Sequence, residues 1–208
     1  MLQTKHIILR DLREEDIEQR IRWETVETEW QQWDAPWEYE GLTEAERQEE
    51  LRHYTEELCR RARQNRTRPE EELRLAFQIE TKGERPEYIG WVTSYCLDED
   101  CNYTEERTDR RAVGLDIPER AARGRGFAYQ ALGLFLPYLM EHGETKLFTQ
   151  TWSGNERMVY IARTLGFEEC RRKKGFRTVR GEKYDGLTFR LNPDKFENFC
   201  QNRLRPLL

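Results

Sequence analysis

Apolar and polar residues follow two distinct periods along the 208-residue chain. Alternating or short continuous apolar runs predict strands, whereas apolar residues three and four positions apart predict helices. The predicted strands are residues 6–10, 73–79, 88–96, 111–117, 147–152, 168–177 and 183–191. The predicted helices are a short one around Ile17 and Ile21, a long one from Thr43 to before Pro69, one over 128–142 and one over 156–165. The polar segment 97–110 is predicted to be a loop.

Signals at helix ends support two of these helices. Thr43 and Glu46 have the spacing of a capping box, in which each residue's side chain satisfies the other's backbone amide. Ser153 and Glu156 repeat that spacing before the last helix. Pro137 lies inside the helix over 128–142, so a kink is expected there.

The order of the predicted elements is strand, helices, three strands, helix, strand, helix and two strands. Strands alternating with helices in this way are typical of the α/β class. A length of 208 residues suits one domain, and no repeat, low-complexity tract or linker divides residues 1–208. Apolar residues make up 37% of the chain and aromatic ones 12%, which is enough for a packed core and argues against global disorder.

Charge and cysteine usage exclude several function classes. The net charge is −5, so a general attraction to nucleic acid or membranes is not expected. No stretch has the length and apolarity of a bilayer span, and the first residues do not resemble a signal peptide. Five scattered cysteines lack the paired spacing of a zinc site, so no metal is expected and free thiols in a reducing cytoplasm fit best. Both a monomer and a homodimer remain open.

The stretch 123–128, Arg-Gly-Arg-Gly-Phe-Ala, connects a predicted strand to a predicted helix. Backbone amides at a helix N-terminus point at one spot, and the helix dipole adds about half a positive charge. Arg123 and Arg125 add two full charges. This combination predicts a seat for a pyrophosphate, whereas the simpler interpretation is a tight turn in which glycine supplies a positive φ.

The spacing of Arg123, Gly126 and Ala128 resembles the Gln/Arg-x-x-Gly-x-Gly/Ala motif of the GCN5-related N-acetyltransferases (GNAT). Asn155 before a predicted helix and Leu-Gly-Phe at 165–167 are similar to further motifs of that family. The resemblance covers roughly residues 7–191 and is closest to the ribosomal-protein N-terminal acetyltransferases. The glycine patterns of dinucleotide-binding folds and nucleotide kinase loops are not present.

The resemblance implies a mixed, twisted sheet of about six to seven strands with helices on both faces. It also implies acetyl-CoA as the co-substrate. The pantetheine arm would enter where the sheet splays, and the residues expected to bind the cofactor are Leu115, Ile117, Arg123, Gly124, Arg125, Gly126, Phe127, Ala128 and Asn155. The implied reaction is direct attack of a primary amine on the acetyl thioester, most simply by a protein or peptide N-terminus. Polyamine or aminoglycoside-like acceptors, and a non-catalytic acyl-CoA-binding module, are the alternatives.

The chain departs from the best-known family members at two positions. Ala112 stands where many carry a catalytic glutamate, and Ala162 stands where many carry a tyrosine that protonates the thiolate. The candidates to replace them are Asp116 as base, and Ser153 and Tyr160 as groups that help the thiolate leave. Asp116 could equally be a structural partner of Arg125, and Asn155 could bind pantetheine or cap its helix.

Tryptophans and carboxylates are interleaved near the start of a helical segment, residues 23–66. Aromatic faces together with carboxylates suit a cationic amine, at about 0.5–2 kcal/mol per cation–π contact. The residues predicted to bind such a substrate are Trp33, Asp34, Trp37 and Glu38. The alternative interpretation is that the tryptophans pack the segment onto the sheet while the acids face water.

Overall fold

The computed structural model describes residues 2–208 and contains one nine-stranded mixed sheet within that range. The strands are β1 (Leu2–Gln3), β2 (Ile7–Arg10), β3 (Ala76–Thr81), β4 (Tyr88–Leu97), β5 (Tyr103–Thr104), β6 (Arg110–Asp116), β7 (Lys146–Trp152), β8 (Phe167–Val179) and β9 (Glu182–Leu191). Their order is β1-β2-β3-β4-β6-β7-β9-β8, with β5 paired to β4. Without the two-residue strands β1 and β5 the sheet has seven strands, which agrees with the expected number.

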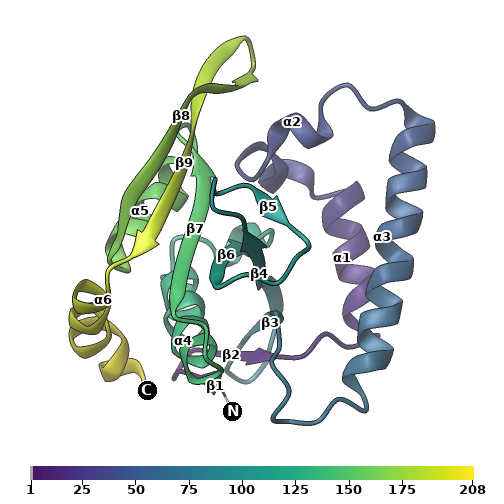
Figure 1. Cartoon of the computed structure of the whole chain (residues 1–208). Helices are drawn as coiled ribbons and strands as arrows, with labels where there is room; N and C mark the ends of the chain where they lie inside the picture. The colour runs from purple at the N-terminus through teal and green to yellow at the C-terminus, as the bar shows by residue number, and fades with distance from the viewer. Residues whose placement is uncertain (1) are drawn as a thin grey trace.

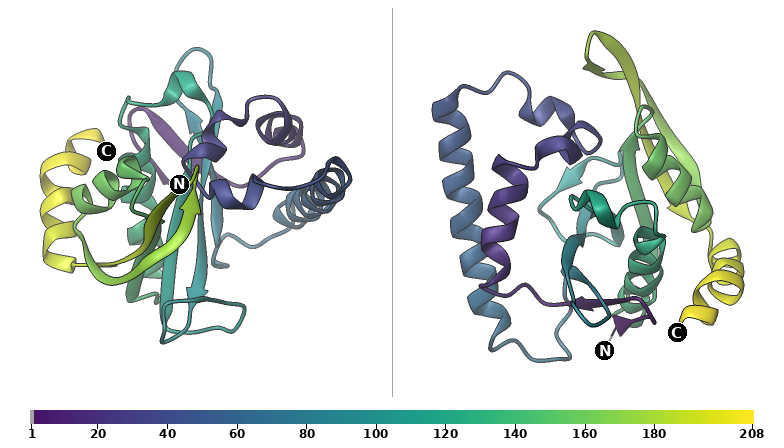
Figure 2. Two further views of the ribbon diagram at one scale, coloured as in Figure 1. Left: turned by 90° about the horizontal axis from the view of Figure 1, so that it is seen from above. Right: turned by 180° about the vertical axis from the view of Figure 1, so that it is seen from behind.

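Helices cover both faces of this sheet, as expected (Figure 1, Figure 2). The α-helices are α1 (Asp16–Thr25), α2 (Pro36–Tyr39), α3 (Glu44–Asn65), α4 (Phe127–Glu141), α5 (Glu156–Thr164) and α6 (Pro193–Phe199). Short 3-10 helices occupy Thr28–Gln32, Arg120–Ala122 and Arg205–Leu207, and a π-helical turn occupies Cys200–Leu204. Helices α1, α2 and α3 lie on one side of the sheet, and α4, α5 and α6 lie on the other (Figure 2).

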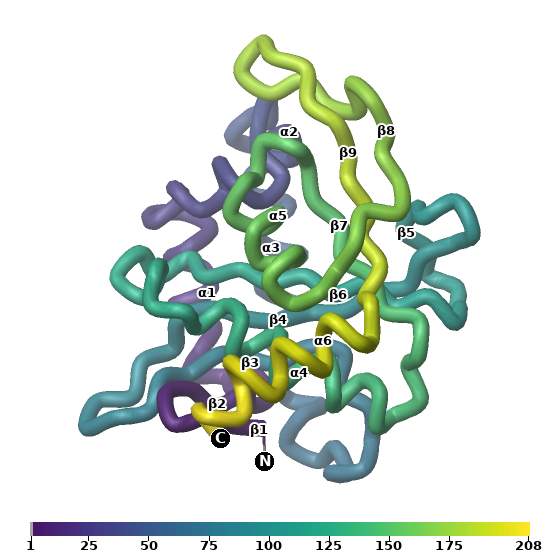
Figure 3. The backbone as a smooth tube through the Cα atoms, turned by 90° about the vertical axis from the view of Figure 1, so that its left-hand side faces the viewer, coloured from purple at the N-terminus to yellow at the C-terminus, as the bar shows by residue number. Residues whose placement is uncertain are grey.

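The largest core lies under α4. Ten of the 15 residues of α4 are buried, because its apolar side chains meet the sheet on one side and the C-terminal helices on another. Leu204 and Phe199 contact the helix at Gly133. Figure 3 shows α6 lying across α4, close to both chain ends. The opposite face of the sheet has smaller clusters, one of which joins Trp23, Trp30 and Trp91.

Strands β6 and β7 run parallel and separate in the middle of the sheet. They pair from Arg110–Lys146 to Val113–Thr149, and the Thr149 Oγ1 donates to the Val113 carbonyl at 2.8 Å. Beyond this last pair both strands continue without pairing to one another. Leu115 therefore lies in a region where the sheet is open on its β7 side, which confirms the expected splay.

Four predictions about local structure need correction. Strand β3 begins at Ala76 rather than at 73, and Leu75 is exposed, so the alternation over 73–75 does not mark a strand. The predicted loop 97–110 contains β5. The capping box predicted for Ser153 and Glu156 is wrong, because Asn155 caps α5. No helix was predicted after residue 191, although Asn192 before a proline is the usual signal, and Asn192 does cap α6.

Two other helix predictions need no correction. The capping box at Thr43 is confirmed: its side chain accepts from the Glu46 amide and the Glu46 carboxylate accepts from the Thr43 amide. Helix α4 runs continuously from Phe127 to Glu141 with Pro137 inside it, and the kink expected at this proline stays a prediction.

Candidate functional site

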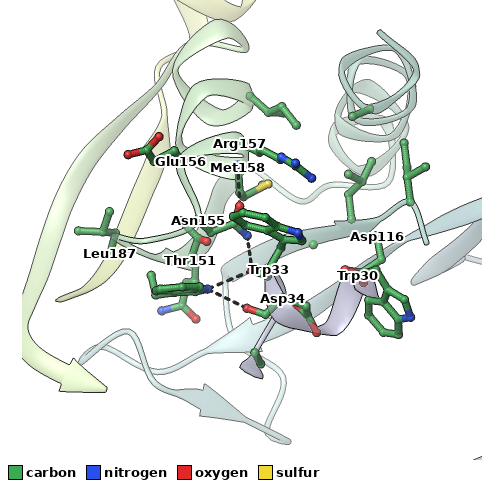
Figure 4. Close-up of a pocket in the computed structure, with 18 of the residues that line it drawn as sticks. Trp30, Trp33, Asp34, Asp116, Thr151, Asn155, Glu156, Arg157, Met158 and Leu187 are labelled. Carbon is green, nitrogen blue, oxygen red and sulfur yellow. Dashed lines mark hydrogen bonds between the residues drawn. The ribbon is translucent and has the colours of Figure 1, made fainter. Parts of the chain in front are cut away.

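A cleft of about 1590 Å³ opens where β6 and β7 separate. One end is formed by the turn 123–128 before α4, all of whose residues except Arg125 line it. The middle is lined by the ends of β6 and β7 together with the first turns of α5. The other end lies between the β8–β9 hairpin and residues 28–39, which we call the strap (Figure 4). The strap comprises the 3-10 helix Thr28–Gln32 and α2.

The turn before α4 is shaped to receive an anion. Gly124 and Gly126 have φ angles of +72° and +78°, a region that side chains rarely adopt. Gly126 is the N-cap of α4, so no side chain caps the helix, and no acidic residue stands in its first turn. Within residues 2–208, the amides of Phe127, Ala128 and Tyr129 meet no hydrogen-bond acceptor. Free amides at the positive end of a 15-residue helix fit a diphosphate.

The two arginines of this turn have different surroundings. Arg123 is tied to the protein: Nε donates to the Ile117 carbonyl and Nη2 to the Pro118 carbonyl, each at 2.8 Å. Its Nη1 forms an ion pair with Glu29 of the strap. Arg125 is exposed, lies 4.9 Å from the Phe127 ring centroid and has no carboxylate within 4 Å among the described residues. Arg125 is thus free to reach an anion, whereas Arg123 anchors the strap.

Tyr129, which the sequence analysis did not single out, lies over the turn. A Cβ built on Gly126 would be 2.6 Å from the Tyr129 ring, so Gly126 is required for this close approach. The ring of Tyr129 is backed by Phe199 from α6 at a centroid distance of 6.0 Å. Its position in the first turn of α4, three residues after Gly126, is the signal that could have revealed it.

The strap is fixed to the far side of the cleft through a backbone carbonyl. Trp152 Nε1 and Asn155 Nδ2 donate to the Trp33 carbonyl at 3.0 and 2.6 Å (Figure 4). Trp152 Nε1 also lies 3.0 Å from the Asp34 carbonyl. The Oδ1 of Asn155 accepts from the Met158 amide at 3.0 Å. Both ends of the Asn155 amide therefore already have protein partners.

The tryptophans of the aromatic segment divide into two groups. Trp30 is buried, donates to the Trp23 carbonyl at 2.9 Å and packs edge-on against Trp91. Trp30, Trp33 and Trp37 all line the cleft, but the latter two are only partly buried. Each of these two bears an arginine on its ring, at 4.3 and 4.9 Å from the ring centroid. The packing interpretation therefore holds for Trp30, whereas Trp33 and Trp37 present more of their surface to the cleft.

Three carboxylates from two distant segments line the middle of the cleft. Asp116 comes from the end of β6, and Asp34 and Glu38 come from the strap. Asp116 is half-buried; desolvation and the negative charge of Asp34 raise the pKa of its carboxyl well above the ordinary value. The Asp34 side chain is exposed to the cleft, and protein surrounds the cleft at this point. Desolvation together with Glu38 raises the pKa of Asp34 to about 6.

A buried cation lies behind these acids. The Arg20 guanidinium is 3.3 Å from the Trp91 ring centroid and makes no ion pair among residues 2–208. Its charge lowers the pKa values of Asp116 and Glu24, although desolvation is the larger effect on each and the net shift of both is upward. This part of the cleft thus holds more negative than positive charge in partly desolvated surroundings. Such surroundings are suited to binding an ammonium group.

The chain matches the model of the acetyltransferase (GNAT) domain over residues 6–168. It belongs to the GNAT acetyltransferase family. Members are acetyl-CoA-dependent N-acetyltransferases, so acetyl-CoA is the co-substrate. No curated protein sequence matches the chain significantly.

Solved structures agree in fold at low identity. RimL, a ribosomal L7/L12 alpha-N-protein acetyltransferase in complex with coenzyme A, is 14% identical with a TM-score of 0.62 and covers 91% of this chain and 95% of its own. A GNAT-family acetyltransferase from Bacillus anthracis is 11% identical with a TM-score of 0.63, covering 93% and 98%. A spermidine N-acetyltransferase chimera of Vibrio cholerae SpeG and hSSAT is 14% identical with a TM-score of 0.59, covering 92% and 98%.

Not all of the remaining predicted site residues of this GNAT protein line the cleft. Leu115, Ile117 and Tyr160 line the cleft, and Tyr160 is 68% exposed. Ser153 does not line it: its Oγ accepts from the Asp185 amide at 2.9 Å, which joins β7 to β9. The Ile117 carbonyl already accepts from Arg123, so it is occupied in this structure.

The two alanines expected at the family's catalytic positions are fully buried. Ala112 packs with Leu97 and Phe148, and Ala162 belongs to the main core. Neither position offers a group to the cleft. The described residues contain no group of three or more His, Cys, Asp or Glu arranged to hold a metal ion, and none of their helices meets the length and apolarity needed to cross a membrane.

Proposed function

We propose that this GNAT protein transfers the acetyl group of acetyl-CoA to the α-amine of a protein or peptide N-terminus by direct attack. The observation that supports this acceptor is the convergence of Asp116 and Asp34 in the middle of the cleft. These carboxyls come from β6 and the strap, and both have raised pKa values. A carboxylate with a raised pKa can act as the base that the two buried alanines do not supply.

The carboxylates act on the amine in two ways. When ionised, which for Asp34 means above about pH 6, they carry negative charge and attract an ammonium group. The bound cation favours their ionised form, so that Asp116, directly or through a water molecule, can then accept the ammonium proton.

The pKa of the acceptor favours an α-amine. An α-amino group has a pKa of about 7.7–8.0, whereas a lysine amine titrates near 10.4. Proton transfer to the same carboxylate is thus less uphill from the α-ammonium than from a lysine, by more than two pKa units. At neutral pH about one α-amino group in ten is already neutral.

The rest of the cleft has roles that follow from its groups. The free amides of the turn before α4, together with Arg125, would hold the pyrophosphate of acetyl-CoA, and the backbone of Leu115 would meet the pantetheine arm. Acetyl-CoA supplies an activated thioester when bound. Tyr160 is the α5 tyrosine that lines the cleft, and we assign it the proton for the departing thiolate. Ser153 is too far outside the lining to be given that role.

A polyamine is the second candidate acceptor, because several carboxylates in one cleft also suit a polycation. The test measures release of CoA thiol from acetyl-CoA with three acceptors. They are a peptide with a free N-terminus, an N-acetylated peptide whose only amine is a lysine side chain, and spermidine. We expect the free N-terminus to be fastest, with a rate that rises across the α-amino pKa. Preference for spermidine or the capped peptide would overturn the α-amine proposal. No turnover with any amine would indicate an acyl-CoA-binding module.

A further inference from the structure

The end of the cleft remote from the phosphate turn carries the opposite charge to its middle. Lys173 and Arg177 of β8 line it, together with Phe176 between them. The acids Asp34 and Glu38 lie on the strap that faces this hairpin. An acceptor that passes from this mouth to the acids therefore meets cations first and carboxylates second.

A bulge in β8 creates this arrangement. The β8–β9 register passes from Lys173–Gly186 directly to Arg177–Tyr184, so three residues of β8 stand opposite one residue of β9. In a regular strand Phe176 and Arg177 would point to opposite faces. Here both line the cleft. Bulges redirect side chains beside functional sites, and this one turns two consecutive residues toward the same space.

Three contacts hold the bulge. Gly175 takes a φ of +57°, and its amide donates to the Asp185 Oδ1 at 2.9 Å. The Phe176 ring covers Gly186, where a Cβ would come within 2.9 Å of the ring. The second oxygen of Asp185 accepts from Arg172 at 2.8 Å. The orientation of Phe176 is thus fixed from both strands.

Arg177 is held in place without an anionic partner. Its guanidinium lies 4.4 Å from the Phe176 ring centroid and 4.9 Å from that of Trp37 on the strap. No carboxylate of residues 2–208 lies within 4 Å of it. The other two arginines of β8 do have such partners: Arg171 pairs with Asp100 at 3.1 Å, and Arg172 with Glu169 at 2.7 Å.

Lys173 is oriented in a similar way. Its Nζ donates to the Asn102 Oδ1 at 2.5 Å and lies 5.4 Å from the Phe176 ring centroid. It has no carboxylate within 4 Å among the described residues. Two cations positioned by aromatic and amide groups, with their charge uncompensated, are suited to bind a carboxylate.

We propose that Arg177, assisted by Lys173, binds a carboxylate of the acceptor, so that the acceptor is an acidic peptide N-terminus with Asp or Glu close behind the α-amine. This inference rests on the proposed function. The carboxylate of the acceptor meets the guanidinium while its ammonium group meets Asp34 and Asp116. A polyamine has no anionic group, and the same two cations repel it.

The test uses three peptides that differ only at their second and third residues, which are Asp-Asp, Asn-Asn or Lys-Lys. The kcat and KM of each are measured by thiol release for the parent, Arg177→Gln and Lys174→Gln. Lys174 is a matched control, because it lies exposed in the same bulge but does not line the cleft.

We expect the parent to prefer the Asp-Asp peptide, with Lys-Lys the poorest acceptor. Arg177→Gln should raise the KM for the Asp-Asp peptide about tenfold, at the lower end for a charged hydrogen bond, and leave the Asn-Asn values unchanged. Lys174→Gln should behave like the parent. Unchanged calorimetric binding of CoA establishes that Arg177→Gln is folded.

Three results would overturn the inference. If the parent acetylates all three peptides equally, or if Arg177→Gln slows all three by the same factor, Arg177 does not select a carboxylate, and the α-amine proposal still stands. If the parent acetylates none of them but acetylates spermidine, the proposed function itself fails, and this inference fails with it.

Discussion

The two functional regions of the cleft are assembled in opposite ways. The phosphate turn is one contiguous stretch, residues 123–128, whose free backbone amides are proposed to bind the pyrophosphate. The acidic wall brings together Asp34 and Asp116, which are 82 positions apart in the chain. A contiguous turn depends mainly on local backbone geometry. A wall built from distant segments depends on every contact that holds the strap across the open sheet.

This difference explains the role of the strap contacts. Arg123 pairs with Glu29 on the β6 side, and Trp152 and Asn155 donate to Trp33 on the β7 side. The strap is thus fixed on both sides of the splay. Loss of either attachment should disturb the amine end of the cleft before it disturbs the phosphate end.

The largest effect is expected from Asp116→Asn, which removes the proposed base but keeps the shape. With a free N-terminal peptide, kcat/KM should fall about 100-fold, the lower end of the range for a positioned base. The KM for acetyl-CoA should stay within about twofold, since the phosphate turn is untouched. Asp109→Asn is the control, because Asp109 is exposed just before β6 and pairs only with Lys146. Parental activity in Asp116→Asn would mean that water removes the proton without it.

Gly126→Val should weaken CoA about 100-fold in calorimetric titration. A β-branched residue cannot take the φ of +78°, and its Cβ would strike the Tyr129 ring. Gly181→Val is the control: it has a φ of +83° in the β8–β9 turn, where a Cβ meets nothing within 4 Å. The control should lose comparable thermal stability and keep CoA binding. A folded Gly126→Val with normal affinity would remove the phosphate site from this turn.

Substitutions of Arg125 and Arg123 should have different effects, because Arg125 is proposed to bind CoA and Arg123 anchors the strap. Arg125→Ala should weaken CoA about tenfold and make the affinity less dependent on salt, since one exposed charge is lost. Arg123→Ala should instead lower the melting temperature and raise the KM for the amine, because it releases two carbonyls and Glu29. Identical effects of the two changes on the salt dependence of CoA binding would contradict this division.

The sequence predicted most of what is local. The strand before the turn, the turn itself and α4 follow from alternation, glycine spacing and helical periodicity, and the structure has them at nearly the expected residues. The splay was expected from the family resemblance, and the end of pairing at Val113 confirms it. The capping signal at 153–156 was ambiguous, because Asn155 could also cap the helix, and it does.

What the sequence could not predict depends on tertiary contacts. Nothing in the spacing of Arg123 shows that its guanidinium reaches Glu29, which is 94 positions away. Nothing in the largely polar sequence of β8 shows that Phe176 and Arg177 turn to the same side at the bulge. The raised pKa of Asp34 arises from surrounding protein and Glu38, so it exists only in the folded chain.

The smallest effect, and the sharpest test of the acidic wall, is expected from Asp34→Asn. A carboxyl whose pKa is raised to about 6 holds its proton more tightly when folded than when unfolded, where the value is about 3.9. Ionisation therefore costs the parent stability as the pH rises from about 4 to 6, and the full cost remains above that range. Asp34→Asn removes this cost, so its melting temperature should exceed that of the parent above pH 6 and equal it near pH 4. The KM for the amine should rise about two- to fivefold, the range for one exposed ion pair, and that for acetyl-CoA should not change. Glu84→Gln, in the exposed turn between β3 and β4, should change neither quantity. If Asp34→Asn destabilises the protein at every pH and spares the amine KM, Asp34 is a packing residue, and the acidic wall loses its proposed function.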